Sequence, residues 1–226
     1  MRIRRKKHLK ERLNGVSDYL LIADRDIPNV NLAIEDKKYI DFSEVFENDQ
    51  PLYLEIGCGK AGFILEYAKL YPQINFVAVE MLQNVIVMGA EKAKELGLKN
   101  LKFFNCSAEY LARYFKDDTF ERIFLNFSPP YPQKGYESRR LTCDRLIGYY
   151  KNFLKDGGWV EQKTDDKDFF DYSKEQFEKF GFVVKDQSEE LKNNKIFNLR
   201  TEYETKFLEQ GLSVYRLMAT VVKKSF

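Results

Sequence analysis

The chain has 226 residues, of which 44% are hydrophobic and 32% charged, and its net charge is +2. This length predicts one ordinary domain with a small appendage and argues against two full domains. No uninterrupted apolar run approaches the roughly 20 residues that span a bilayer, so the sequence predicts a soluble protein with no membrane partner.

Positive charge is concentrated in the first residues of the chain. Residues 1–12 hold seven Lys or Arg against one Glu, an excess of six, which leaves the remainder with a net charge of minus four. Such a basic arm suits contacts with phosphate, and a solvated tail without a partner is the alternative. No apolar segment follows the arm, so nothing indicates a secretory signal, and we expect a cytoplasmic protein.

Cysteine and histidine usage limits the chemistry. Cys58, Cys106 and Cys143 lie far apart with no CxxC pair, so reduced thiols and no metal site are expected. The single histidine, His8, excludes Ser-His-Asp triads and histidine metal clusters. The chemistry must come from other residue types or from a cofactor.

Short apolar runs alternate with amphipathic segments from residue 52 onward. Strands are predicted at 52–57, 75–80, 101–105, 122–127 and 158–164. Helical patterns lie at 61–70, 84–96, 108–116, 140–154 and 166–180. This order predicts an α/β, Rossmann-like fold with a mostly parallel sheet and helices on both faces. Two more strands, 182–186 and 214–222, bring the expected sheet to seven strands.

The predicted elements divide the chain into a lead-in and a main domain. Residues 1–50 are predicted to form the basic arm and a lead-in segment, and residues 51–226 the main domain. The polar segment 187–212 is too long for a hairpin turn and is a candidate functional insertion. We find no internal repeat or low-complexity tract.

The first predicted strand ends in a glycine-rich turn, EIGCGKAG. Gly57, Gly59 and Gly62 permit a tight turn and close approach of a ligand to the backbone, a need shared by dinucleotides and S-adenosylmethionine. Glu55 would repel a pyrophosphate but can accept hydrogen bonds from an ammonium group, which favours S-adenosylmethionine. A glycine-rich turn with no ligand is the alternative.

Polar residues also follow the next two predicted strands. Glu80 ends the second strand, where a carboxylate can accept hydrogen bonds from both ribose hydroxyls of a cofactor. A cap for the helix that begins near residue 83 is the alternative. Asn105 and Ser107 follow the third strand, where adenine contacts would fall.

The loop after the fourth predicted strand allows two chemistries. Residues 128–131 read SPPY, the Ser-Pro-Pro-aromatic loop of enzymes that methylate exocyclic amines, in which the loop accepts the N–H bonds of a poor nucleophile. A ring nitrogen such as guanine N7 instead presents an in-plane lone pair and carries no proton. It needs alignment with the methyl donor and no general base.

Residues farther along the chain favour the ring nitrogen. The stretch 126–142, NFSPPYPQKGYESRRLT, resembles the bacterial tRNA (guanine-N7)-methyltransferases, whose corresponding stretch reads approximately N-F-S-D-P-W-P-K-K-R-H-x-K-R-R-L-T. The runs QKTDD at 162–166 and TEYETKF at 201–207 match two further family elements, which amine methyltransferases lack. The resemblance spans essentially the whole chain. It implies a class I methyltransferase that uses S-adenosylmethionine to methylate N7 of guanine 46 in the variable loop of tRNA.

The resemblance also implies roles for particular residues. It places Glu55, Glu80, Ser107 and Pro129 at cofactor positions. It places Gln133, Asp165, Thr201, Glu202, Tyr203 and Glu204 at substrate positions. Pro129 and Ser107 stand where the family has aspartates, and Gln133 where it has a lysine. Proline offers only its backbone carbonyl in place of the carboxylate.

Asp165 is the best catalytic candidate. A carboxylate at the end of a strand can accept from N1–H and the N2 amine of guanine, orient the base and offset the charge of the cationic product. The alternative is a cap for the helix at 166.

Basic and aromatic residues near the loop are candidates for RNA contact. Lys134, Arg139 and Arg140 are candidates for tRNA phosphate contacts, with simple solvation as the alternative. Tyr131 and Tyr136 are stacking candidates that could equally serve in packing. Trp159 is predicted to lie in the core.

Two other functions remain open at this point, and the oligomeric state, monomer or homodimer, is not predicted. One is an exocyclic amine methyltransferase acting on N6 of adenine or on a protein amide. The other is a catalytically impaired RNA-binding homologue, because the family aspartates at Pro129 and Ser107 are missing.

Overall fold

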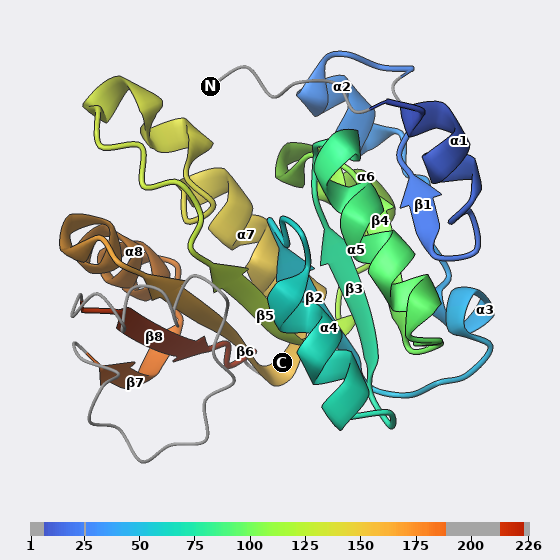
Figure 1. The fold of residues 1–226 in the computed structure, drawn as a ribbon. Coiled ribbons are helices and arrows are strands. Elements are labelled where there is room, and N and C mark those ends of the chain that lie inside the picture. The colour runs from blue at the N-terminus through green and yellow to red at the C-terminus, as the bar shows by residue number, and fades with distance from the viewer. Residues whose placement is uncertain (1–6, 25, 189–212, 224–226) are drawn as a thin grey trace.

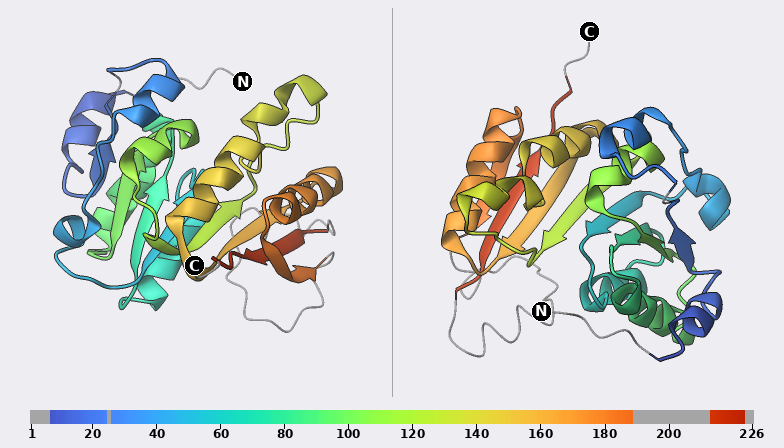
Figure 2. Two further views of the ribbon diagram at one scale, coloured as in Figure 1. Left: turned by 180° about the vertical axis from the view of Figure 1, so that it is seen from behind. Right: turned by 90° about the horizontal axis from the view of Figure 1, so that it is seen from above.

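The computed structural model describes residues 7–24, 26–188 and 213–223. Eight strands in this part of the chain form one sheet in the order β1-β4-β3-β2-β5-β6-β8-β7. Helices cover both faces of the twisted sheet (Figures 1 and 2). None of the described helices is both long and apolar enough to cross a membrane.

The bounds of the elements are as follows. The strands are β1 (Leu20–Ile22), β2 (Leu52–Ile56), β3 (Asn75–Val79), β4 (Leu101–Asn105), β5 (Phe120–Asn126), β6 (Leu154–Thr164), β7 (Val183–Ser188) and β8 (Tyr215–Thr220). The α-helices are α1 (Leu9–Asn14), α2 (Val30–Glu35), α3 (Phe42–Phe46), α4 (Gly62–Leu70), α5 (Gln83–Glu95), α6 (Leu111–Tyr114), α7 (Asp144–Phe153) and α8 (Lys167–Lys179). Two 3-10 helices are η1 (Ala108–Tyr110) and η2 (Lys134–Arg139).

Two apolar cores lie on opposite faces of the sheet. Side chains of α4 and α5 pack on one face against Phe76, Phe103 and Phe124. Side chains of α3, α6, α7 and α8 pack on the other face against Leu54 and Ile123. Because successive residues of a strand point to opposite faces, a strand covered on both sides is mostly apolar. The inner strand β3, NFVAV, is accordingly buried at every position and apolar after Asn75.

The order in which successive strands are added to the sheet reverses at β2. Strands β3 and β4 lie on one side of β2 in chain order, and β5 and β6 lie on the other. β2 is parallel to both β3 and β5, and β5 is parallel to β6. In an open α/β sheet, ligands bind outside the carboxyl ends of the strands at such a reversal. The topology therefore predicts a ligand site at the carboxyl ends of β2 and β5.

The structure confirms the expected fold and adds elements near the N-terminus. All seven predicted strands are present, and the short strand β1 adds an eighth, paired in parallel with β4. Helices α1, α2 and α3 were not predicted, because five or six residues are too few to establish a helical period. The predicted helix 108–116 is shorter and is divided into η1 and α6.

A buried arginine attaches the lead-in segment to the main domain. The Arg113 side chain is fully buried, and its guanidinium donates to Asp26 Oδ1 at 2.7 Å and to Asp36 Oδ2 at 2.6 Å. The guanidinium of Arg113 holds the pKa of Asp26 far below its ordinary value. Since Arg113 belongs to α6, this contact fixes the chain between β1 and α3 against the sheet.

We predict opposite effects for two helical glycines. A Cβ at Gly89 in α5 would lie 2.7 Å from Ala61 Cβ and 2.8 Å from Phe103 Cε1, whereas at Gly148 in α7 it would lie 3.8 Å from Phe180 Cε1. Gly89→Ala should lower the free energy of unfolding by about 1–3 kcal/mol through overpacking. Gly148→Ala should leave it unchanged or raise it by up to about 1 kcal/mol through helix propensity. Urea unfolding checks both, and equal effects would contradict this account of Gly89.

Candidate functional site

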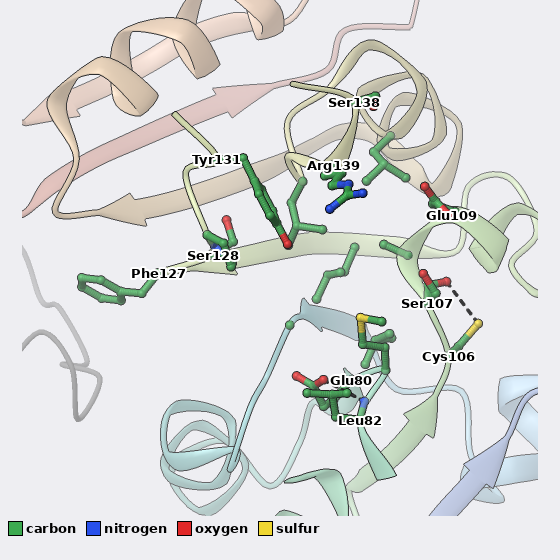
Figure 3. Close-up of a pocket in the computed structure, with 18 residues that line it drawn as sticks. Glu80, Leu82, Cys106, Ser107, Glu109, Phe127, Ser128, Tyr131, Ser138 and Arg139 are labelled. Atoms are coloured by element: carbon green, nitrogen blue, oxygen red, sulfur yellow. Dashed lines mark hydrogen bonds between the residues drawn. The ribbon is translucent and has the colours of Figure 1, made fainter. Parts of the chain in front are cut away.

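A pocket of about 540 Å³ opens at the carboxyl ends of four neighbouring strands. Its wall is formed by residues 56–57 after β2, 79–82 after β3, 106–109 after β4, 127–129 and Tyr131 after β5, and parts of 138–146. In Figure 3, Ser128 and Tyr131 lie on one side of the pocket and Glu80 with Leu82 on the opposite side. The pocket lies at the reversal of strand order, where the topology predicts a ligand site.

The glycine turn after β2 is tied to the end of β3. Gly57 and Gly59 have positive φ angles of 79° and 56°, which glycine adopts without a steric penalty. The Gly57 amide donates to the Val79 carbonyl at 2.8 Å. The Glu80 carboxylate accepts from the amides of Gly59 at 3.3 Å and Leu82 at 2.9 Å. Glu80 thus holds the turn and the start of α5 together while it lines the pocket.

Three other predicted cofactor residues, Asn105, Ser107 and Gly62, lie in different places. The Asn105 side-chain amide donates to the Glu80 carbonyl at 2.9 Å, and Asn105 is buried. Its side chain therefore supports the backbone that carries the Glu80 carboxylate. Ser107 is half-buried in the pocket wall beside η1, and Gly62 is the first residue of α4.

Glu55 is a buried carboxyl group beneath the glycine turn. It is 2% exposed, and its Oε1 atom accepts from Asn126 Nδ2 at 3.0 Å. Its Oε2 atom is buried without a hydrogen-bond partner among the described residues. Burial raises the pKa of Glu55 to about 7, although the Asn126 hydrogen bond and the Lys163 charge act in the opposite direction. A ligand that donates a hydrogen bond or carries a positive charge would stabilise the ionised form of this buried carboxyl group.

The loop after β5 has a constrained backbone. Phe127 and Tyr131 have positive φ angles of 49° and 42°, which are uncommon for residues other than glycine. The Phe127 amide donates to the Lys163 carbonyl at 2.8 Å, so the loop begins in register with β6. Ser128 lines the pocket and is 8% exposed, and its hydroxyl oxygen is buried without a hydrogen-bond partner in the described part of the chain. Pro129 is exposed at the pocket wall.

The basic residues predicted to contact phosphate occupy different environments. Arg139 is exposed in the pocket wall, with its guanidinium 4.6 Å from the centre of the Tyr136 ring. Lys134 and Gln133 are also exposed, at the start of η2. Arg140 is 8% exposed and donates hydrogen bonds within the protein. Arg139, Lys134 and Gln133 are therefore exposed, whereas most of the Arg140 side chain is buried.

Asp165 follows β6 and is exposed, and it is not part of the pocket wall. The cap of α8 is its neighbour Asp166, whose Oδ1 accepts from the Phe169 amide at 2.8 Å. The helix cap that the sequence offered as the alternative role of Asp165 is therefore supplied by Asp166. The strand register pairs Asn126 with Lys163, so the segments after β5 and β6 leave the sheet side by side.

Sequence patterns did not identify several residues near the site. Cys106, Glu109 and Ser138 line the pocket. Glu109 belongs to η1 and Ser138 to η2, and the sequence did not predict either 3-10 helix. Glu161 forms a buried ion pair with Arg216 at 2.9 Å, where β6 pairs with β8. Spacing along the chain carries no signal for contacts between such distant residues. The predicted substrate positions Thr201, Glu202, Tyr203 and Glu204 lie outside the described residues.

Comparisons with known proteins define the class. A family model described as "Putative methyltransferase" matches residues 49–217. The solved structure of the 16S rRNA methyltransferase KamB aligns with a TM-score of 0.64 at 12% sequence identity, covering 83% of this chain and 96% of that one. At that identity the likeness concerns the fold alone. Together with the family match, it makes this chain a methyltransferase with the class I, Rossmann-like fold.

Closer relatives define the family. The tRNA (guanine-N(7)-)-methyltransferase of Geobacillus kaustophilus (strain HTA426) is 37% identical over 220 residues, which cover 97% of this chain and 96% of the relative. The enzyme of the same name from Staphylococcus epidermidis (strain RP62A) is 43% identical over 178 residues, covering 78% of this chain and 83% of the relative. The chain belongs to the tRNA (guanine-N(7)-)-methyltransferase family, as its motifs predicted.

We predict that Glu55→Gln changes the pH dependence of stability. The pKa of Glu55 in the folded chain, about 7, lies above its ordinary value of 4.5. Between these values the unfolded chain releases the proton while the folded chain keeps it, so the free energy of unfolding of the wild type falls as pH rises. Glutamine cannot ionise. The variant should therefore gain roughly 2–3 kcal/mol on the wild type between about pH 5 and about pH 8.

Urea unfolding at the two pH values measures this gain. Glu66→Gln, which alters an exposed carboxylate of α4, is the matched control and should show no comparable gain. A Glu55→Gln difference that stays constant with pH would contradict the raised pKa.

Proposed function

We propose that this chain transfers the methyl group of S-adenosylmethionine to N7 of a guanine in tRNA, at position 46 of the variable loop. The observation that carries the proposal is the pocket at the strand ends. Two of the segments that match the family motifs, the glycine turn and the loop after β5, form parts of its wall. Membership of the family supports the same reaction.

The residues of the pocket wall and of the adjoining glycine turn fit the proposed cofactor. A Cβ at Gly59 would meet nothing within 4 Å, so the turn leaves space for a ligand against its backbone. Glu80 would accept hydrogen bonds from the ribose hydroxyls, and Ser107 would lie at the adenine. The orphaned Oε2 of Glu55 suits a donor such as an ammonium group. When bound, S-adenosylmethionine supplies an electrophilic methyl group on a sulfonium centre.

The protein's own part in the reaction is alignment. Guanine N7 presents an in-plane lone pair and carries no proton, so no side chain has to act as a base. Asp165 would accept from N1–H and the N2 amine, which orients the base and offsets the positive charge of the product. Tyr131, half-buried in the pocket wall, and the exposed Tyr136 would stack on the base, while Arg139 and Lys134 would contact phosphates.

One observation favours a second function, methylation of an exocyclic amine. Ser128 heads an SPPY sequence and lines the pocket, and its buried hydroxyl has no hydrogen-bond partner among the described residues. An oxygen in that position could accept an amine N–H. Pro129 takes the place of a family aspartate and brings only its carbonyl. The identity of the methylated nucleoside separates the two functions.

The test is to incubate the purified protein with an unmodified tRNA transcript and methyl-labelled S-adenosylmethionine, and then to identify the labelled nucleoside after digestion. We expect 7-methylguanosine. Label in an N6-methyladenosine or N2-methylguanosine fraction would favour the amine function. Binding of tRNA and cofactor without any label would indicate an RNA-binding protein that has lost turnover.

We predict that Asp165→Ala lowers methyl transfer roughly 100-fold, because a base that is no longer oriented spends less time in line with the methyl group. Its affinity for S-adenosylmethionine, measured by calorimetry, should remain that of the wild type. Asp168→Ala, which removes an exposed carboxylate from the first turn of α8, is the control and should preserve both quantities. Equal loss of cofactor affinity and transfer in Asp165→Ala would remove it from the substrate site.

A further inference from the structure

The loop formed by residues 127–131 is held with few backbone hydrogen bonds of its own. After the Phe127 amide pairs with β6, none of the backbone hydrogen bonds between described residues involves positions 128–132. Three of these five residues are prolines, which have no N–H to donate. Positive φ angles at Phe127 and Tyr131 add backbone strain. The surroundings must therefore fix the conformation of this loop.

The Arg140 side chain supplies that support. Its Nε atom donates to the Pro130 carbonyl at 2.8 Å, and its Nη2 atom donates to the Tyr131 carbonyl at 3.0 Å. The guanidinium also lies 4.2 Å from the centre of the Tyr172 ring on α8. A planar guanidinium can bond two adjacent carbonyls and stack on a ring at the same time, which an ammonium group cannot reproduce.

The backbone that carries Arg140 is itself anchored to two helices. The next residue, Leu141, accepts a hydrogen bond from the Tyr150 hydroxyl of α7 at 2.8 Å. The Thr142 hydroxyl lies 2.9 Å from the Ser173 hydroxyl of α8, and this contact is buried. Arg140 therefore connects the loop to the body of the domain, on the side where α7 and α8 cover the sheet (Figure 1).

The two adjacent arginines have different surroundings. Arg139 is exposed, lines the pocket and lies over the Tyr136 ring, so its charge is available to a phosphate. Arg140 is 8% exposed, and two of its nitrogens, Nε and Nη2, donate to carbonyl oxygens of the loop. A phosphate that bound these two donors would release the loop. The sequence alone predicts phosphate contacts from both arginines.

We propose that Arg140 is a positioning residue, whose guanidinium holds the loop so that Ser128 and Tyr131 remain in the pocket wall. This inference rests on the proposed methyl transfer, because it assigns Arg140 a role in that reaction. Arg140 acts through the loop and contacts neither the tRNA nor the transferred methyl group. Loss of its hydrogen bonds should lower turnover without weakening the electrostatic part of tRNA binding.

The experiment compares Arg140→Ala and Arg140→Lys with Arg139→Ala. For each variant, kcat is measured at saturating tRNA and S-adenosylmethionine, and the dissociation constant for tRNA is measured over a range of potassium chloride concentrations. Hydrogen exchange of the Phe127 amide, which donates to the Lys163 carbonyl at the start of the loop, is followed in the protein alone. The last readout needs no activity, so a failure of the proposed function and a failure of the positioning role give different results.

Arg140→Ala should lower kcat about 10–100-fold, as expected for a misplaced pocket wall. Its slope of log Kd against log salt should equal that of the wild type, and the Phe127 amide should exchange faster. Arg140→Lys should recover little of the lost kcat, because charge alone does not hold both carbonyls. Arg139→Ala should instead reduce the salt slope by about one while exchange of the loop stays as in the wild type.

Other outcomes would overturn the proposal. A reduced salt slope in Arg140→Ala with normal kcat and normal exchange would make Arg140 a phosphate contact. Full recovery of kcat by Arg140→Lys would show that only the charge matters. If Arg140→Ala does not fold, Tyr172→Leu removes only the ring beneath the guanidinium. That variant should lower kcat with the salt slope unchanged, and wild-type exchange of the Phe127 amide would contradict the role.

Discussion

The parallel pairing of β3, β2, β5 and β6 is the constraint on which the site depends. Parallel strands end at the same edge of a sheet, so segments that are distant in sequence meet there. The glycine turn, the Glu80 carboxylate and the loop after β5 consequently share one pocket. The register of Asn126 with Lys163 adds the start of the Asp165 segment beside that loop. A slip in this register would separate groups that a single methyl transfer requires.

Hydrogen bonds from groups outside the pocket hold its wall in place. Asn105 supports the backbone of Glu80, and the Glu80 carboxylate in turn holds the amide of Gly59. Arg140 has the corresponding role for the loop after β5, where it binds two carbonyls. A reaction that needs no general base depends on this alignment, because the nucleophile is already competent and only its distance and direction remain to be set.

Local patterns in the sequence predicted most of the fold and the location of the site. Alternating apolar runs identified the seven longer strands, and glycine spacing with Glu80 identified one side of the pocket. Short elements such as β1 and η2 were not predicted, since three to six residues carry little periodicity. The different environments of Arg139 and Arg140 were not predicted either, because only tertiary packing shows which of two adjacent arginines is buried.

The central claim is that a ring nitrogen lone pair in this pocket attacks the methyl group. The most direct test is a tRNA in which 7-deazaguanine replaces guanine 46, which exchanges N7 for a C–H group and keeps the base's other polar atoms. The account predicts that this tRNA binds with the affinity of the unaltered tRNA and that it gains no methyl group at position 46. Methyl transfer to the 7-deazaguanine at the normal rate would contradict the account and indicate an exocyclic amine as the acceptor.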